Sequence, residues 1–425
     1  MTEIAAVDAW EVLDSRGHPT VRVQVTAGGE TGTFTVPAGA STGDHEAVER
    51  RDGGDRYGGL GVRGAVETVR DELAPLVVGC DVTDQTGVDE SLADYDGTDD
   101  FSAVGANAAL GVSGGVAHAA SAARDEPLYE YLARDSPGRI PLPMVNVVSG
   151  GLHASRGPEI QDFLVVPVGA DAYPDALEVV WDVRSAVGDR IAGDGSPLVA
   201  DEGGFSPDVE SVDDAFDLLA AGVRDAGYDL GGDVAFAVDV AAAHFYDAET
   251  DRYVLDSVGR SLTRDGMVDL VAQWVDDYPL VSVEDPLTED DWEGWATLAD
   301  RIGDEVQVLG DDLLVTNESR LDRAVDADAA NAVLVKPNQT GTLTGARRVV
   351  EAAKEAGWAT VVSARSGETC DATIADFAVA LDAGQIKVGS LARSERLAKY
   401  NRLLAIDRFH DGEFAGRDAL VPRNP

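Results

Sequence analysis

Val234-Ala235-Phe236-Ala237-Val238-Asp239 is a short apolar run that ends on a carboxylate, and it opens a part of the chain in which this pattern recurs. The later runs end on charged or polar residues in the same way: 280–283 at Glu284, 306–310 at Asp311, 332–335 at Lys336, 360–363 before Arg365 and Ser366, and 385–386 at Lys387. The charged positions from Asp239 to Lys387 follow one another at steps of 45, 27, 25, 29 and 22 residues. Each step has the length of a strand, a helix and two loops, which predicts consecutive parallel βα units.

Repeated βα units form either an open doubly wound sheet or a closed barrel. No GxGxxG motif follows the first of these strands, and functional side chains stand at many strand ends rather than at one switch point. We therefore predict an α/β fold with a (β/α)8-type TIM barrel. In such a barrel the C-terminal ends of the strands share one active site.

The first part of the chain has a different character. Alternating segments at 21–25 and 32–36, a Gly-rich loop and an Ala-rich helical stretch around 105–124 predict an α+β domain. Residues 137–143 are dense in Pro and Gly, which interrupt regular structure. We place the boundary there, with an N-terminal α+β capping domain over 1–136 and the barrel domain over 137–425.

The chain is strongly acidic. Its 425 residues include 33 Lys and Arg against 78 Asp and Glu, a formal net charge of −45. This charge repels nucleic-acid phosphate and anionic membrane surfaces, so we expect neither as a partner. Self-repulsion of this size is screened effectively only by concentrated salt. We therefore favour a halophile's cytoplasm, with an acidic mesophilic protein as the alternative.

The termini and the cysteines add little chemistry. The N-terminus lacks a basic segment followed by an apolar one, and no window approaches the about 18 apolar residues of a membrane span, so we expect a cytoplasmic protein. Cys80 and Cys370 lie far apart and outside any CxxC spacing. We expect both to be buried and inert, with neither a zinc site nor a disulfide.

Carboxylates and lysines at the strand ends carry the chemical signal. Asp239, Glu284 and Asp311 would repel one another at a shared centre unless a cation lay between them, and hard oxygen ligands suit Mg²⁺. The alternative is that they are solvated surface acids, which this chain has in abundance.

Lysine is rare in this chain, and its placement is informative. Lys336 and Lys387 are two of only four lysines, beside 29 arginines. A lysine can lose its proton when burial or nearby cations lower its pKa, whereas an arginine cannot. The alternative is that each lysine only balances nearby carboxylates.

Eight motifs in order along the chain point to a family. They are Leu13-Asp14-Ser15-Arg16-Gly17, Gly39-Ala40-Ser41-Thr42-Gly43, Asp201-Glu202-Gly203-Gly204, Val283-Glu284-Asp285-Pro286, Gly310-Asp311-Asp312, Lys336-Pro337-Asn338-Gln339, Arg365-Ser366-Gly367-Glu368-Thr369 and Ala392-Arg393-Ser394-Glu395-Arg396. With these motifs the chain resembles the enolase family over nearly its whole length.

The resemblance implies dehydration of 2-phosphoglycerate, a phosphorylated hydroxyacid, to phosphoenolpyruvate by a homodimer or higher homo-oligomer. It implies Lys336 as the base and Glu202 as the general acid, a role that needs a raised pKa. It further implies Asp239, Glu284 and Asp311 as ligands of one Mg²⁺, and Ser41, on a mobile loop, at a second Mg²⁺. Gln161 and Asp162 would belong to the acid network. Arg365 and Ser366 would bind the substrate phosphate, Lys387 would face the substrate carboxylate, and His153 would lie on a loop near the phosphate. Without the resemblance, His153 would be read as an ordinary loop histidine.

The acid side departs from the family pattern. Ala364 stands where a histidine usually precedes the Arg-Ser pair, Asp162 replaces a glutamate, and Ser149 replaces an asparagine. His244 and Thr340 stand where glutamate and isoleucine are common. Three interpretations stay open: 2-phosphoglycerate dehydration, a paralogue acting on another phosphorylated or phosphonate-bearing hydroxyacid, and a metal-binding pseudoenzyme. The retained base, acid and carboxylates argue against the third.

Overall fold

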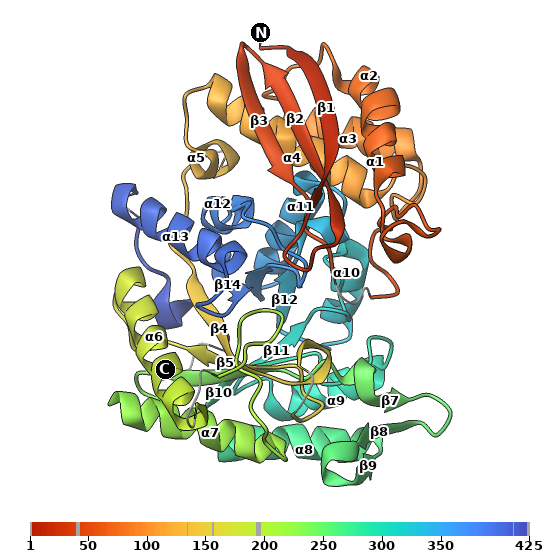
Figure 1. Ribbon diagram of the computed structural model, residues 1–425. Coiled ribbons are helices and arrows are strands. Elements are labelled where there is room, and N and C mark those ends of the chain that lie inside the picture. The colour runs from red at the N-terminus through yellow and green to blue at the C-terminus, as the bar shows by residue number, and fades with distance from the viewer. Residues whose placement is uncertain are drawn as a thin grey trace.

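The structure is a computed structural model that describes residues 2–39, 43–133, 135–154, 157–192, 197–410 and 412–422. An N-terminal part with a small sheet and several helices stands on a closed barrel; in Figure 1 the sheet is at the top and the barrel below it. The α+β and barrel architectures predicted from the sequence are both confirmed.

The N-terminal sheet is an antiparallel meander of β1 (Ile4–Leu13), β2 (Pro19–Ala27) and β3 (Glu30–Thr35). Helix α4 (Ala106–Ala123) packs across this sheet, and its bounds are close to those of the helical stretch predicted around 105–124. The approach is tight because α4 presents glycines: a Cβ on Gly114 would lie 2.3 Å from the ring of Phe34. The other helices of this part are α1 (Arg63–Thr68), α2 (Ala74–Val77), α3 (Gln85–Asp96) and α5 (Leu128–Ala133).

The barrel closes in the strand order β10-β11-β12-β13-β14-β4-β5-β6. Its strands are β4 (Leu142–Ser149), β5 (Asp162–Val166), β6 (Ala235–Asp239), β10 (Leu280–Glu284), β11 (Gln307–Gly310), β12 (Ala332–Val335), β13 (Ala359–Ser363) and β14 (Gly384–Gly389). All six apolar runs found in the sequence are barrel strands, and closure decides for the barrel over the open sheet. The last run, expected at 385–386, extends to a six-residue strand.

One strand breaks the expected parallel pattern. β5 runs antiparallel to both β4 and β6, with Asp162 opposite Ser149 on one side and Asp239 on the other. A parallel return needs a long crossover that usually contains an α-helix, but the described part of the β4–β5 connection holds only the 3₁₀ turn Gly151–His153. The start of β5 therefore lies where the other strands end. This reversal carries Asp162 to the mouth of the barrel.

Helices surround the barrel, and several begin at side-chain caps. They are α6 (Tyr173–Ile191), α7 (Val212–Ala226), α8 (Arg264–Asp277), α9 (Trp292–Ile302), α10 (Glu318–Asp326), α11 (Leu343–Glu355), α12 (Thr373–Ala380) and α13 (Ser394–Phe409). Ser211, Thr263, Asp291, Asn317 and Thr342 each accept a backbone N–H in the first turn of the helix that follows. A separate small sheet contains β7 (Tyr246–Asp247), β8 (Arg252–Leu255) and β9 (Arg260–Leu262).

Backbone pairing joins the N-terminal part to the loop that follows β13. Ala38 and Gly367 exchange two N–H to carbonyl bonds of 2.8 Å, and the Ser15 N–H donates to the Glu368 carbonyl at 2.7 Å. The loop after β13 contains Arg365 and Ser366. The N-terminal part is therefore attached directly beside the predicted phosphate-binding residues.

The cysteines differ from the expectation of burial. Both are free, but Cys80 is only half-buried and Cys370 is exposed, because Cys370 lies in the loop between β13 and α12 and not on a core-facing strand or helix. Among the residues described above, no helix combines the length and apolar character that crossing a membrane requires.

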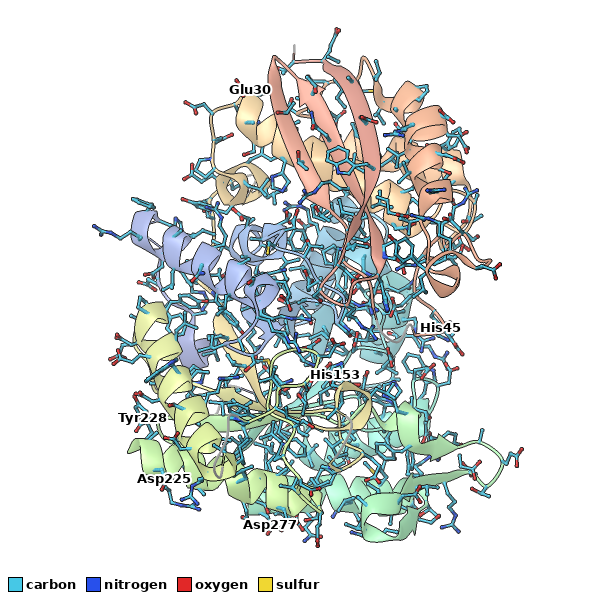
Figure 2. The ribbon with its side chains drawn as sticks, viewed as in Figure 1. Glu30, His45, His153, Asp225, Tyr228 and Asp277 are labelled. Carbon is cyan, nitrogen blue, oxygen red and sulfur yellow. The ribbon has the colours of Figure 1, made fainter. Side chains whose placement is uncertain are left out.

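Acidic side chains populate the outside of the molecule, and Figure 2 shows Glu30, Asp225 and Asp277 at its periphery. With a net charge of −45, we expect the midpoint of thermal unfolding to rise steeply between dilute and molar KCl, because the screening length falls from about 10 Å at 0.1 M to about 3 Å at 1 M. Calorimetry or circular dichroism measures this. Sucrose, which favours burial without screening charge, is the control. A midpoint unaffected by KCl would favour the mesophilic alternative.

Candidate active site

A small cavity of about 40 Å³ lies at the mouth of the barrel, where the strands end. It is lined by Glu46, His153, Gln161, Asp162, Glu202, Asp239, Ala241, His244, Asp285, Asp311, Asp312, Lys336, Ser363, Ala364, Arg365, Ser366 and Lys387. The predicted site residues are thus brought together, with two exceptions. Glu284 is buried and accepts a hydrogen bond from Lys387, but it does not line the cavity. Ser41 lies outside the described residues.

The lysines and the strand-end carboxylates are paired with one another. Lys387 Nζ donates to Asp239 Oδ2 and Glu284 Oε2, both at 2.7 Å, and Lys336 Nζ donates to Asp311 Oδ2. Burial acts to lower the pKa of Lys387, but its two carboxylate partners raise the pKa well above its usual value. Burial also acts to lower the pKa of Lys336, but the charge of Asp311 raises it above its usual value. Both lysines therefore carry a proton in this arrangement.

The carboxylates suit a divalent cation. Asp239 and Glu284 are opposite each other on adjacent strands, and Asp311 follows the next strand. Burial and the charges of Asp239 and Asp311 raise the pKa of Glu284 well above its usual value despite Lys387. Three carboxyl groups meet two ammonium groups here, and their oxygens are the hard ligands that Mg²⁺ prefers.

A second acidic group lies beside the first. Ligand oxygens of Asp285, Asp311 and Asp312 lie within 4.8 Å of one another. Both carboxylate oxygens of Asp285 already accept hydrogen bonds, from the backbone N–H groups of Asp311 at 3.0 Å and Asp312 at 2.8 Å. Burial, followed by the charge of Asp311, raises the pKa of Asp312 to about 7. Asp285 thus serves to fix the backbone that presents Asp311.

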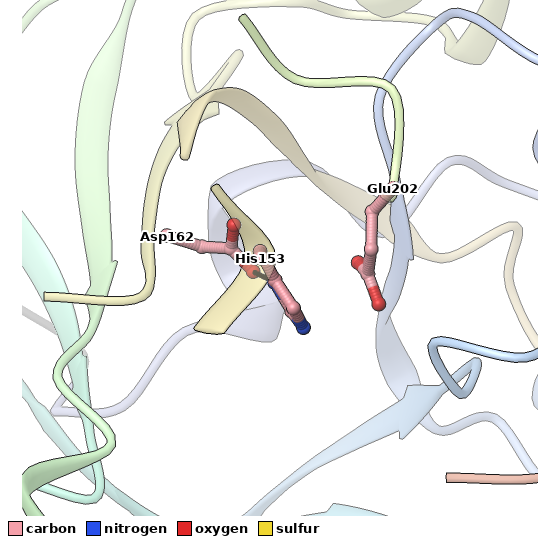
Figure 3. A group of neighbouring side chains, drawn as sticks. All are labelled: His153, Asp162 and Glu202. Atoms are coloured by element: carbon pink, nitrogen blue, oxygen red, sulfur yellow. Dashed lines mark hydrogen bonds and ion pairs between the residues drawn. The ribbon is translucent and has the colours of Figure 1, made fainter. Parts of the chain in front are cut away.

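On the acid side, the imidazole of His153 lies between Asp162 and Glu202 (Figure 3). His153 Nδ1 is 3.0 Å from Asp162 Oδ2, and Asp162 also accepts from Asn146 and, at 3.0 Å, from the Ser149 hydroxyl. Burial acts to lower the pKa of His153, but Asp162 raises it to about 9. His153 is therefore a protonated histidine at neutral pH, and Ser149 is part of its support.

The pKa of Glu202 is lowered, not raised as its role as general acid led us to expect. Burial acts to raise the pKa, but Arg396, 3.8 Å away, and His153 hold it below the usual value. The loop reaches the cavity because Gly203 adopts a φ of +87° and a Cβ on Gly204 would lie 2.5 Å from Asn146 Oδ1. Glu202 is thus ionised in this state, and the proton of the acid side is on His153.

Three departures from the family pattern have different surroundings. His244, in the 3₁₀ turn Ala242–Phe245, lines the cavity, and burial lowers its pKa. Ala364 lines the same cavity and adds no polar side chain. Among the described contacts, the Thr340 hydroxyl donates only to nearby backbone carbonyls, those of Pro337 and Thr342. It therefore stabilises the turn after β12.

Two predicted residues have partners that the sequence does not indicate. The Gln161 amide donates to Asp239 Oδ2 at 3.2 Å, which connects it to the carboxylate group. Arg365 forms a two-point ion pair with Glu46 from the N-terminal part. The sequence analysis did not single out Glu46, because acidic residues are too common in this chain, 78 in all, for any one of them to indicate a site. Its position shortly after the Gly-rich loop was the feature that could have pointed to it.

Fold and site together define a class: a barrel enzyme with an N-terminal α+β part, in which ammonium, imidazolium and carboxylate groups surround a candidate cation site. Residues 4–132 match the family model "Enolase, N-terminal domain", and 138–422 match "Enolase, C-terminal TIM barrel domain". A curated relative from Rubrobacter xylanophilus named "Enolase" is 48% identical over 425 residues, which cover 99% of this chain and 97% of the relative. The chain belongs to the enolase family.

Proposed function

We propose that this chain is a phosphopyruvate hydratase, which reversibly dehydrates 2-phospho-D-glycerate to phosphoenolpyruvate in glycolysis and gluconeogenesis with Mg²⁺. The observation that carries the proposal is one cavity with two chemically distinct sides. Lys336 and Lys387 stand among carboxylates on one side, and His153, Asp162 and Glu202 form a protonated group on the other. Removal of a proton and loss of hydroxide need these two sides.

The carboxylate side removes the α-proton. Asp239, Glu284 and Asp311 would hold one Mg²⁺, with Ser41 proposed at a second. Bound Mg²⁺ supplies positive charge, which stabilises the negative charge that develops on the substrate and lowers the pKa of Lys336 toward the range of a base, as in enolase-superfamily sites generally. Lys336 Nζ takes the α-proton. Lys387 neutralises the substrate carboxylate.

The acid side releases the hydroxyl group. Glu202 first takes up the proton held by His153 and then donates it to the departing hydroxide, so that water leaves. The proton is available next to it, because ligand atoms of His153 and Glu202 lie within 4.8 Å and the pKa of His153 is raised to about 9. Asp162 orients His153 through the 3.0 Å contact at Nδ1. Arg365 and Ser366 bind the phosphate, Arg365 with a charged fork and Ser366 with a neutral donor.

Two further properties belong to this proposal. We infer a cytoplasmic protein that works as a homodimer or higher homo-oligomer, and membership of the enolase family supports both. Sedimentation velocity at molar KCl tests the second, with a species of 44.5 kDa, the mass of one chain, as the contradicting outcome.

Ala364 favours a second candidate function, a paralogue with a different leaving-group side. On the main proposal, the missing side chain slows hydroxide loss but not proton removal, because Lys336 and the carboxylates are on other strand ends. We expect wild type to exchange the α-proton of 2-phosphoglycerate with solvent deuterium faster than it forms phosphoenolpyruvate. Ala364→His should raise the dehydration rate by about 10²- to 10⁴-fold, the effect of one positioned proton-transfer group.

Phosphoenolpyruvate formation and proton exchange, measured on both variants, separate the candidates. His244→Ala is a useful companion, because loss of dehydration in that variant alone would mean that His244 already supplies the missing function. Fast dehydration by wild type that Ala364→His slows would contradict an impaired acid side. No turnover of 2-phosphoglycerate by either variant would favour the paralogue.

A further inference from the structure

The partner of Arg365 comes from the other part of the chain. Arg365 Nη1 donates to Glu46 Oε2 at 2.8 Å, and Nη2 donates to Glu46 Oε1 at 3.1 Å. The two side chains are only 4% and 6% exposed. Nη1 also donates to Asn338 Oδ1 at 3.0 Å. The predicted phosphate-binding guanidinium is thus held by a buried, two-point ion pair.

Glu46 is fixed independently of Arg365. Its Oε1 accepts the Gly43 N–H at 3.1 Å, and its own N–H donates to the Gly43 carbonyl at 3.1 Å, which closes a tight turn. The turn packs closely against the loop that follows β11: a Cβ on Gly43 would lie 2.9 Å from Val315 Cγ1 and 3.1 Å from Asp312 Oδ1. The next residue, Ala47, donates its N–H to the Gln339 carbonyl at 3.0 Å.

Gln339 connects this turn to the carboxylate side. Its Nε2 lies 3.3 Å from Glu46 Oε1 and 3.1 Å from Asp311 Oδ1, and its Oε1 accepts from the Thr316 hydroxyl at 2.6 Å. The Gln339 side chain is buried, so these bonds are its fixed environment. Glu46 therefore stands between the phosphate-binding arginine and the carboxylate that is paired with the candidate base.

Two roles for Glu46 are physically possible. As a competitor it would occupy Arg365 until phosphate displaced it, and as a positioning residue it would stay and hold the guanidinium. Glu46 is also held by Gly43 and Gln339, so displacement would break contacts unrelated to Arg365. The contacts of Glu46 with Gly43 and Gln339 therefore favour positioning.

We propose that Glu46 is a positioning residue for phosphate recognition, so that the phosphate side of the cavity is complete only when residues 43–47 dock on the barrel. This inference rests on the proposed function, because it takes Arg365 as the phosphate ligand. It assigns a described residue of the N-terminal part, Glu46, a task in phosphate recognition.

The test compares Glu46→Gln, which keeps the shape and removes the charge, with Glu46→Asp, which keeps the charge. Binding of inorganic phosphate in the presence of Mg²⁺ is measured by titration calorimetry, and KM and kcat are measured with 2-phosphoglycerate. We expect Glu46→Gln to weaken phosphate binding and to raise KM by about 10- to 100-fold, the usual effect of removing an orienting partner, with kcat changed much less. Glu46→Asp should recover part of the loss.

Asp376→Asn is the matched control. Asp376 forms a two-point pair with Arg402 away from the cavity, and its side chain is 4% exposed. This variant should lower the thermal midpoint but leave phosphate affinity and KM unchanged. If Glu46→Gln does not fold, Glu46→Asp alone carries the test, with an intermediate loss of phosphate affinity expected.

The outcomes distinguish this inference from the proposed function. Phosphate affinity that is unchanged or tighter in Glu46→Gln would overturn positioning, even if wild type turns over 2-phosphoglycerate. Wild type that binds no phosphate would overturn it too. If wild type binds phosphate, Glu46→Gln weakens that binding and neither dehydrates 2-phosphoglycerate, then positioning stands and the proposed function fails.

Discussion

Replacing Lys336 with alanine should abolish exchange of the substrate α-proton with solvent deuterium, with a loss of at least about 10²- to 10⁴-fold, the range for a positioned proton-transfer group. The reason is geometric. Lys336 lies at the cavity wall, where its side chain is 13% exposed and donates a hydrogen bond to Asp311. Nuclear magnetic resonance of 2-phosphoglycerate in D₂O measures exchange without requiring hydroxide loss. The measurement therefore isolates the first chemical step.

Two variants sharpen this prediction. Lys336→Arg should fail as well, because a guanidinium stays protonated under all accessible conditions. Lys354→Ala is the matched control: this lysine is 41% exposed and donates to the carbonyls of Leu381 and Asp382, away from the cavity. It should exchange the proton at the wild-type rate. Near-normal exchange in either Lys336 variant would remove that residue from the role of base.

Removal of divalent cations should abolish phosphoenolpyruvate formation, and added Mg²⁺ should restore it. Without Mg²⁺, Asp239 and Glu284 pair with Lys387, and Asp311 pairs with Lys336, so both lysines are held in the charged form. Turnover after treatment with EDTA and titration back with MgCl₂ measures this. Undiminished turnover after thorough chelation would contradict the metal site.

A second readout does not depend on turnover. A ligand that binds only the folded state stabilises it, so Mg²⁺ should raise the thermal midpoint of wild type at constant ionic strength. Glu284→Gln should lose most of this shift, because Glu284 is one of the three proposed ligands. Glu293→Gln is the control, since the Glu293 side chain is 83% exposed and pairs only with Arg264 among the described contacts. A shift that is equal in all three proteins would place the ion elsewhere.

Much of the barrel was predictable because its strands are buried on both faces. Such strands are nearly continuous apolar runs, and a charged residue marks the point where each run leaves the core. The pattern could not reveal that β5 is antiparallel, since a strand has the same two-residue side-chain period in either direction. For the same reason, local sequence did not show why Asp162 reaches the cavity at the start of its strand rather than at its end.

The amino-acid sequence by itself determined the barrel, the α+β part before it, and the presence of carboxylates and lysines at successive strand ends, because local periodicity and spacing carry that information. Only the tertiary structure decided which charges meet: Lys387 with Asp239 and Glu284, and Arg365 with Glu46, which is 319 positions away in the chain. It also placed Arg396 and His153 beside Glu202 and so lowered the pKa of that carboxyl. Pairing and pKa depend on distance and burial, and these quantities exist only once the barrel has closed and the N-terminal part has docked on it.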